Sequence, residues 1–268
     1  IGNAQTLGYA AATHNVTVKS LLMTGADAPA SPTLANHLDP VQGAGRPNYE
    51  RSLSILQGGE RPVTPVTTTS GLRASAATPA APASEGFAFG TAAQAGYQAV
   101  FFTTAQTVTG LVATLNWNVT SATISGGALI DTRDAALIFS DLGLQLATAT
   151  LVGGQYVLSP LEGARFRSDV TDDNVEHLRF ADVLPAGTYA LLVRGDATRA
   201  TTFGLSYHLT TSATPLLLAD ANWDGVVDSV DRDIILSHMG MNVTGGYAQG
   251  DLNFDDVVDQ DDYLLFLQ

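Results

Sequence analysis

The sequence contains no cysteine and few basic residues. Its 268 residues include 12 Lys and Arg against 26 Asp and Glu, which gives a formal net charge of −14 and a pI near 4.4. The absence of cysteine excludes disulfides, thiolate catalysis and Cys-ligated zinc. The acidic balance argues against a nucleic-acid partner and against an anionic membrane surface, since both need basic residues. No run of 18 apolar residues occurs, so no membrane span is predicted.

The apolar content is high enough for a folded protein. Hydrophobic residues make up 45% of the chain and the mean hydropathy is +0.13. At ~100–200 residues per domain, the length allows two or three domains. The chain starts at Ile1 without a Met or a signal peptide, and we expect it to be the downstream piece of a longer polypeptide.

The negative charge is concentrated at the C-terminal end. Residues 214–268 contain eleven Asp and one Arg, so this fifth of the chain carries −10 of the total −14. Such an asymmetry indicates a separate module.

The middle of the chain, residues 86–211, has short apolar runs with period-two alternation, separated by glycine-containing turns. Many short strands of this kind predict an antiparallel β-sandwich. Leu111, Ala113, Leu115 and Trp117 would share one face of a strand, which places Trp117 in the core.

Residues 1–61 contain two stretches with helical spacing, at 17–24 and 46–56, and too few apolar residues for an independent core. We expect this segment to be the tail of a larger domain. Residues 62–85 are rich in Pro, Thr and Ala and predict a semi-extended linker.

The acidic module contains one pattern twice, in windows that start at Asp220 and Asp251. Each window has Asp, Asn and Asp at loop positions 1, 3 and 5, Val at 7 and 8, and Asp at 9 and 12. Calcium prefers six to eight oxygen ligands, and a tight loop supplies them from side chains 1, 3, 5 and 12, from the carbonyl of 7, and from 9 through water. The predicted ligands of two calcium ions are Asp220, Asn222, Asp224, Val226, Asp228 and Asp231 in the first loop, and Asp251, Asn253, Asp255, Val257, Asp259 and Asp262 in the second.

Three further expectations follow from these loops. Without a cation the crowded carboxylates repel one another, so calcium binding and folding of the module should be coupled. Val227 and Val258 should pair the loops over a shared core. Position 6 favours a left-handed backbone, which Gly225 adopts freely and Asp256 tolerates less well, so the second site should be the weaker or the more strained one.

A duplicated EF-hand-like loop with an exit helix and no entry helix resembles the dockerin module, especially type I, over about residues 215–268. The resemblance implies docking onto a cohesin-like or cell-surface protein. In dockerins, loop positions 10 and 11 often contact the partner, and here they are Ser229, Val230, Gln260 and Asp261. The frequent Ser-Thr pair and the basic pair further along the helix are not reproduced, since Ser237-His238 stands at the latter place.

The N-terminal piece carries a second resemblance. Residues 18–27 and 37–48, with Gly43-Ala44-Gly45, look like the end of a subtilisin-like (S8 family) serine protease domain. That family's nucleophile, His and Asp motifs would lie upstream of Ile1, so no catalytic residue is assigned. Residues 172–178 and 184–189 resemble the accessory β-sandwich found behind some secreted proteases.

Together these features predict a multi-domain, mainly β chain: a short α-helical protease-domain remnant (1–61), a linker (62–85), an antiparallel β-sandwich (86–211) and a small α dockerin-like paired calcium-loop module (214–268). The expected role is the non-catalytic C-terminal region of a secreted hydrolase, a subtilisin-like serine endopeptidase (subtilase), with the calcium-binding module serving protein docking or anchoring at the cell surface. Two alternatives remain open: a carbohydrate-binding, anchoring accessory region of a polysaccharide-degrading enzyme, and a structural surface protein.

Overall fold

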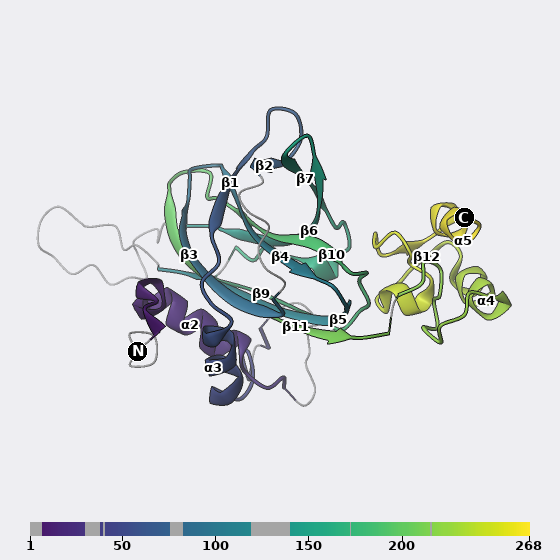
Figure 1. Ribbon diagram of the computed structural model, residues 1–268, viewed down its shortest axis with the longest axis horizontal. Coiled ribbons are helices and arrows are strands. Elements are labelled where there is room, and N and C mark those ends of the chain that lie inside the picture. Colours follow the sequence, from purple (N-terminus) through teal and green to yellow (C-terminus); the bar gives the residue numbers. More distant parts are fainter. Residues whose placement is uncertain are drawn as a thin grey trace, which may run out of the picture.

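The computed structural model describes residues 7–29, 38–39, 41–75, 83–118, 140–171, 173–214 and 216–268. The described chain is mainly β, as predicted, and all pairings between its named strands are antiparallel. Figure 1 shows a large body of strands with a small module that holds the C-terminus beside it.

One sheet of the body has four strands in the order β3-β11-β5-β9. Their bounds are Glu85–Ala92 for β3, Thr107–Trp117 for β5, Val175–Phe180 for β9 and Thr201–Ser212 for β11. The predicted apolar face of β5 is confirmed, because Leu111, Ala113, Leu115 and Trp117 are all at most 2% exposed. The indole Nε1 of Trp117 donates to the carbonyl of Ser140 at 2.7 Å.

The other sheet closes on itself. Its strands follow the order β10-β4-β1-β2-β7-β6-β8, and β10 also pairs with β6, which joins six strands into a ring. The strands are β1 (Val63–Thr67), β2 (Arg73–Ser75), β4 (Tyr97–Thr104), β6 (Gly143–Val152), β7 (Gln155–Pro160), β8 (Arg167–Ser168) and β10 (Gly187–Arg194). Closure removes the unpaired edges that an open sheet would expose. The sequence did not predict this ring.

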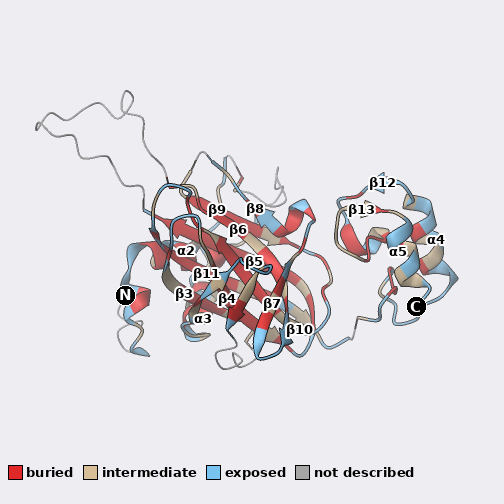
Figure 2. Ribbon diagram, turned by 90° about the horizontal axis from the view of Figure 1, so that it is seen from above, coloured by how far each residue is buried: buried red, intermediate tan, exposed pale blue. Residues whose placement is uncertain are grey.

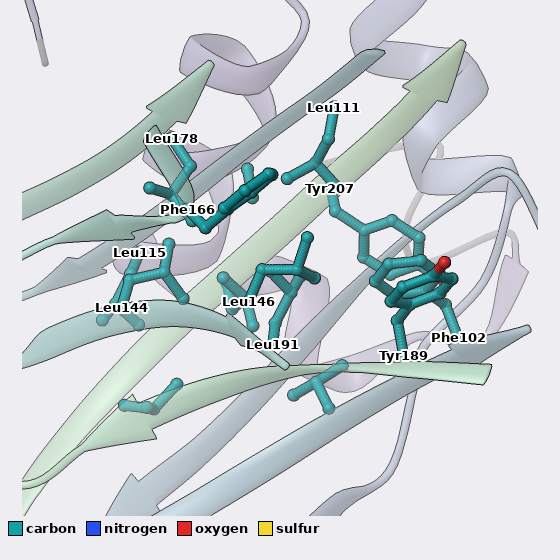
Figure 3. Close-up of a cluster of buried hydrophobic side chains, with 14 of the residues drawn as sticks. Phe102, Leu111, Leu115, Leu144, Leu146, Phe166, Leu178, Tyr189, Leu191 and Tyr207 are labelled. Carbon is teal, nitrogen blue, oxygen red and sulfur yellow. The ribbon is translucent and has the colours of Figure 1, made fainter. Parts of the chain in front are cut away.

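The main core lies between the four-stranded sheet and the wall of the ring that β4, β6 and β10 form. Phe102 stacks on Tyr189 and Tyr207, with ring centroids 5.5 Å and 5.2 Å apart, at one end of this core (Figure 3). The strand β10 is buried on both faces, since Leu191 faces this core and Leu192 packs inside the ring. Figure 2 shows how strongly the buried residues concentrate in these strands.

The helices expected in the N-terminal segment are present as α2 (Asn15–Thr24) and α3 (Tyr49–Gln57). They lie against the four-stranded sheet (Figure 1), and Thr24 Oγ1 lies 2.9 Å from Thr114 Oγ1 of β5. The approach is close at Gly204 of β11, where an added Cβ would lie 2.5 Å from the backbone nitrogen of Thr17. The polar face of β5 is therefore covered by α2 rather than by water.

The segment predicted as a linker, residues 62–85, differs from that expectation. Within its described part, β1 and β2 form two sides of the ring and β3 begins at Glu85. Ala74 of β2 is only 2% exposed, and Val66 of β1 packs on the same cluster inside the ring. The linker prediction was based on the Pro- and Thr-rich composition, which lacks the large apolar residues of a core. Pairing with β4 and β7 nevertheless places these residues in a sheet, because the neighbouring strands supply the apolar contacts. The β body therefore begins before residue 86.

The C-terminal module contains α4 (Ser229–His238), β12 (Met241–Asn242), the 3₁₀ turn η3 (Gly246–Gln249), β13 (Val257–Val258) and α5 (Gln260–Phe266). Its own small core is built around Ile235, Tyr247, Leu252 and Val258. The predicted exit helices are present, and α4 and α5 begin within the last three positions of the two acidic windows. Over the described residues, no helix is long and apolar enough to cross a membrane.

Candidate metal centre

The first acidic window folds into a tight loop around the carboxylate of Asp220. This side chain is 0% exposed, and its two oxygens accept the backbone N–H groups of Asp224 (3.0 Å) and Gly225 (2.8 Å). The backbone is left-handed at Trp223 (φ 58°) and at Gly225 (φ 90°). These two turns wrap the chain around the position-1 carboxylate.

The second window has the same geometry. Asp251 is 0% exposed and accepts the N–H groups of Asp255 (3.0 Å) and Asp256 (3.1 Å). The left-handed residues are Phe254 (φ 66°) and Asp256 (φ 69°), at the same loop positions 4 and 6. The sequence repeat is therefore also a repeat of conformation.

Positions 9 and 12 begin the exit helices. Asp228 is the N-cap of α4 and forms a capping box with Asp231, and Asp259 and Asp262 do the same for α5. Each position-12 carboxylate also accepts a backbone N–H from the start of its loop: that of Asn222 at 3.1 Å and that of Asn253 at 3.1 Å. Asp231 and Asp262 are both 0% exposed. A short Asp at position 12 thus links the loop's first turn to its exit helix.

Positions 3 and 5 contact each other. In the first loop Asn222 Nδ2 donates to Asp224 Oδ2 at 2.8 Å, and in the second Asn253 Nδ2 donates to Asp255 Oδ2 at 2.9 Å. Among the described residues, no group of three or more His, Cys, Asp or Glu side chains is placed to hold a metal ion. Val226 and Val257 would offer only their backbone carbonyls to an ion. For Oδ2 of Asp224 or of Asp255 to bind an ion, its hydrogen bond with the asparagine at position 3 would have to break.

The expected pairing of the two loops through Val227 and Val258 is not what the structure shows. β13, which contains Val258, pairs with β12, where Val258 stands opposite Met241. Val258 is 0% exposed, whereas Val227 is 41% exposed. The strand β12, which follows α4, takes the place beside β13. The valines of the first loop, Val226 and Val227, therefore stay on the surface.

The second loop is held against the β body, a contact that sequence reasoning missed. Arg165, in the 3₁₀ turn η2 (Ala164–Phe166), donates from Nη2 to Asp251 at 2.7 Å and from Nε to Asp182 at 2.9 Å. Its Nη1 is ion-paired with Asp256. No local signal around Arg165 predicted this role, since the residues lie 86 and 91 positions apart in the chain.

Burial acts on the carboxylates of the second loop. Desolvation raises the pKa of Asp251, and the hydrogen bond and charge of Arg165 oppose that shift. Burial also raises the pKa of Asp262, against the three backbone N–H groups that it accepts. Burial therefore disfavours the charged forms of both groups, and the surrounding donors, with Arg165 at Asp251, oppose it only in part.

The four residues predicted for partner contact lie in the first turns of the exit helices. Ser229 and Val230 are exposed at the start of α4, and Gln260 and Asp261 are exposed at the start of α5. Val230 is 51% exposed although it is apolar.

Comparisons with known proteins found little. No family model matches the chain, and no curated protein matches it. Among solved structures, the crystal structure of the Yersinia pseudotuberculosis-derived mitogen is similar over 48% of this chain and 87% of that chain, with 13% identity and a TM-score of 0.29. A likeness of this size carries no argument about function.

Proposed function

We propose that this chain is the non-catalytic C-terminal region of a secreted hydrolase, in which the C-terminal module binds two calcium ions and attaches the chain to a protein partner. The observation that carries the proposal is the repeated loop: two windows 31 residues apart fold with the same backbone turns around a position-1 carboxylate that is 0% exposed.

Helix capping accounts for only part of this arrangement. It explains Asp228, Asp231, Asp259 and Asp262, since Asp is a favoured N-cap and the N3 carboxylate completes the box. It does not account for Asp220, whose carboxylate is removed from water and accepts the N–H groups of Asp224 and Gly225, which bring no positive charge. A calcium ion would supply the charge that oxygen-only loops lack.

The attachment role is supported by the resemblance of residues 215–268 to dockerins and by the exposure of Ser229, Val230, Gln260 and Asp261. The partner would be a cohesin-like or cell-surface protein, which places the chain outside the cell. The subtilase parent and the accessory-sandwich role of the body are supported by the resemblances of residues 1–61 and 172–189. The carbohydrate-binding alternative gains no support from Trp117, since this side chain is 1% exposed and cannot stack on a sugar.

The test is calcium titration of the full chain, after treatment with a chelator, by isothermal calorimetry and native mass spectrometry. We expect two ions per chain, one in Asp231→Asn, one in Asp262→Asn and none in the double variant. Asp233→Asn is the matched control, because Asp233 is exposed on α4 outside the loop and should leave both ions bound. A wild-type chain that takes up no calcium would contradict the proposal.

A further inference from the structure

The two loops differ in what surrounds them. Arg165 reaches from the β body into the second loop, and its side chain is only 9% exposed. Asp182, two residues after β9 in the same body, binds Nε of the guanidinium at 2.9 Å. Asp182 also accepts the N–H of Tyr247 at 3.3 Å and so contacts the module itself.

The residues that flank Arg165 also contact the second loop. The N–H of Gly163 donates to the carbonyl of Phe254 at 2.9 Å, and the N–H of Ala164 donates to the carboxylate of Asp256. The Phe166 ring packs edge-on against Phe254 with centroids 5.9 Å apart. Loop positions 4 and 6 therefore form a docking contact with the body.

This contact explains the residue at position 6. A left-handed backbone is less favourable for a non-glycine residue than for glycine. At Asp256 (φ 69°) the cost is offset by the ion pair with Arg165 and the N–H of Ala164. Among the described residues, no atom lies within 4 Å of the place where a Cβ would stand on Gly225, at the same position of the first loop.

The charge around the position-1 carboxylate differs as well. Asp251 shares its Oδ2 between the loop's own N–H at Asp256 and the guanidinium of Arg165. In the described part of the chain, Asp220 forms no salt bridge with Lys or Arg. The one Lys or Arg in the sequence of residues 214–268 is Arg232, and its side chain pairs with Asp233.

We propose that Arg165 stands in for part of the cation charge at the second loop and competes with calcium there, so that the two sites are unequal. This inference rests on the proposed function and deepens it. A guanidinium and a divalent ion on one carboxylate repel each other, and the buried position of Arg165 reduces screening by water. The first loop takes calcium without this competitor. By reciprocity, calcium in the second loop weakens the contact between module and body.

A purely structural role for Arg165 gives a different result. If Arg165 served only to hold Asp251 in a calcium-ready position, its removal would weaken calcium binding at the second loop. The sign of the change in affinity therefore separates competition from support.

The experiment uses full-length chain with one loop disabled. In the Asp262→Asn background only the first loop binds, and in the Asp231→Asn background only the second. Arg165→Gln removes the charge and keeps a hydrogen-bond donor, and Arg165→Lys keeps the charge. Calorimetric titration with calcium should show at least tenfold tighter binding for R165Q than for Arg165 in the D231N background. R165Q should be without effect in the D262N background, and R165K should remain within about threefold of Arg165.

Unchanged or weaker binding of calcium by R165Q at the second loop would overturn the competition. Failure of both single-loop backgrounds to bind calcium would instead overturn the proposed function, so the two failures are distinguishable.

A measurement on the wild-type chain does not depend on whether R165Q folds. Hydrogen exchange of the Gly163 and Ala164 amides, which donate into the second loop, should become at least threefold faster at saturating calcium. The D262N variant should show no such acceleration. Calcium-induced protection of these two amides, or no change, in the wild type would overturn the competition.

Discussion

The backbone N–H of Asp259 donates to Oδ2 of Asp262 at 2.8 Å, and the Asp259 side chain in turn accepts the N–H of Asp261 at 2.8 Å. The same reciprocal pair begins α4, where Asp228 donates to Asp231 at 2.9 Å. Each acidic window therefore ends in a helix start, and part of its charge is required by the helix whether or not an ion is bound.

Removal of a cap should destabilise the chain in the absence of calcium. Asp259→Ala leaves the first N–H groups of α5 without their acceptor, and we expect a loss of about 1 kcal/mol in the free energy of unfolding. Asp261→Ala is the control, because Asp261 is exposed and lies two residues after Asp259. It removes the same charge but leaves the cap in place, and it should change the free energy of unfolding by less than about 0.5 kcal/mol. Urea unfolding followed by circular dichroism in chelator measures both, and equal effects would show that the cap is unimportant.

The contact between α2 and the sheet predicts the effect of a single methyl group. In Gly204→Ala the new Cβ would lie 2.5 Å from the backbone nitrogen of Thr17, and the helix would have to move. We expect a loss of about 1–3 kcal/mol in stability, as is typical of overpacking.

The matched control is Gly187→Ala at the start of β10, where the nearest atom to a new Cβ is 3.7 Å away. It should be close to neutral by thermal or urea unfolding. If G204A were as stable as G187A, then α2 would not be a fixed part of the β body.

A buried carboxyl in β9 predicts a pH dependence. Glu176 is 0% exposed, and burial raises the pKa of this side chain from its ordinary 4.5 to about 8, against hydrogen bonds from Ser168 and from the N–H of Val170. The nearby carboxylates of Asp169 and Asp173 add to the increase in pKa. Between these two values the folded protein holds a proton that the unfolded chain has released.

Stability should therefore fall as pH rises from about 5 to about 8, by up to about 1.4 kcal/mol per pH unit from this group. Glu176→Gln, which is neutral at every pH, should flatten that part of the curve of unfolding free energy against pH. Glu162→Gln, at an exposed position, should leave the slope unchanged. An unaltered slope in E176Q would show that Glu176 does not titrate in this range.

The sequence predicted those elements whose side chains carry a local pattern. The face of β5 was found because Leu111 and Trp117 belong to a run of apolar residues that recurs at period two. The helices α2 and α3 and the exit helices α4 and α5 follow their local spacing in the same way. For the two acidic loops, the repeat indicated equal geometry, and the paired left-handed residues at positions 4 and 6 are consistent with that.

The sequence alone therefore determined the mainly β character, the concentration of charge in residues 214–268 and the repeated loop, because each depends on residues close together in the chain. Only the tertiary structure decided that β1 and β2 complete a ring, that Val227 stays exposed, and that Arg165 enters the second loop. These features are set by pairings and ion contacts between distant segments. The free energy of each such contact depends on which distant residue the fold brings near, and the local composition of either segment does not specify that residue.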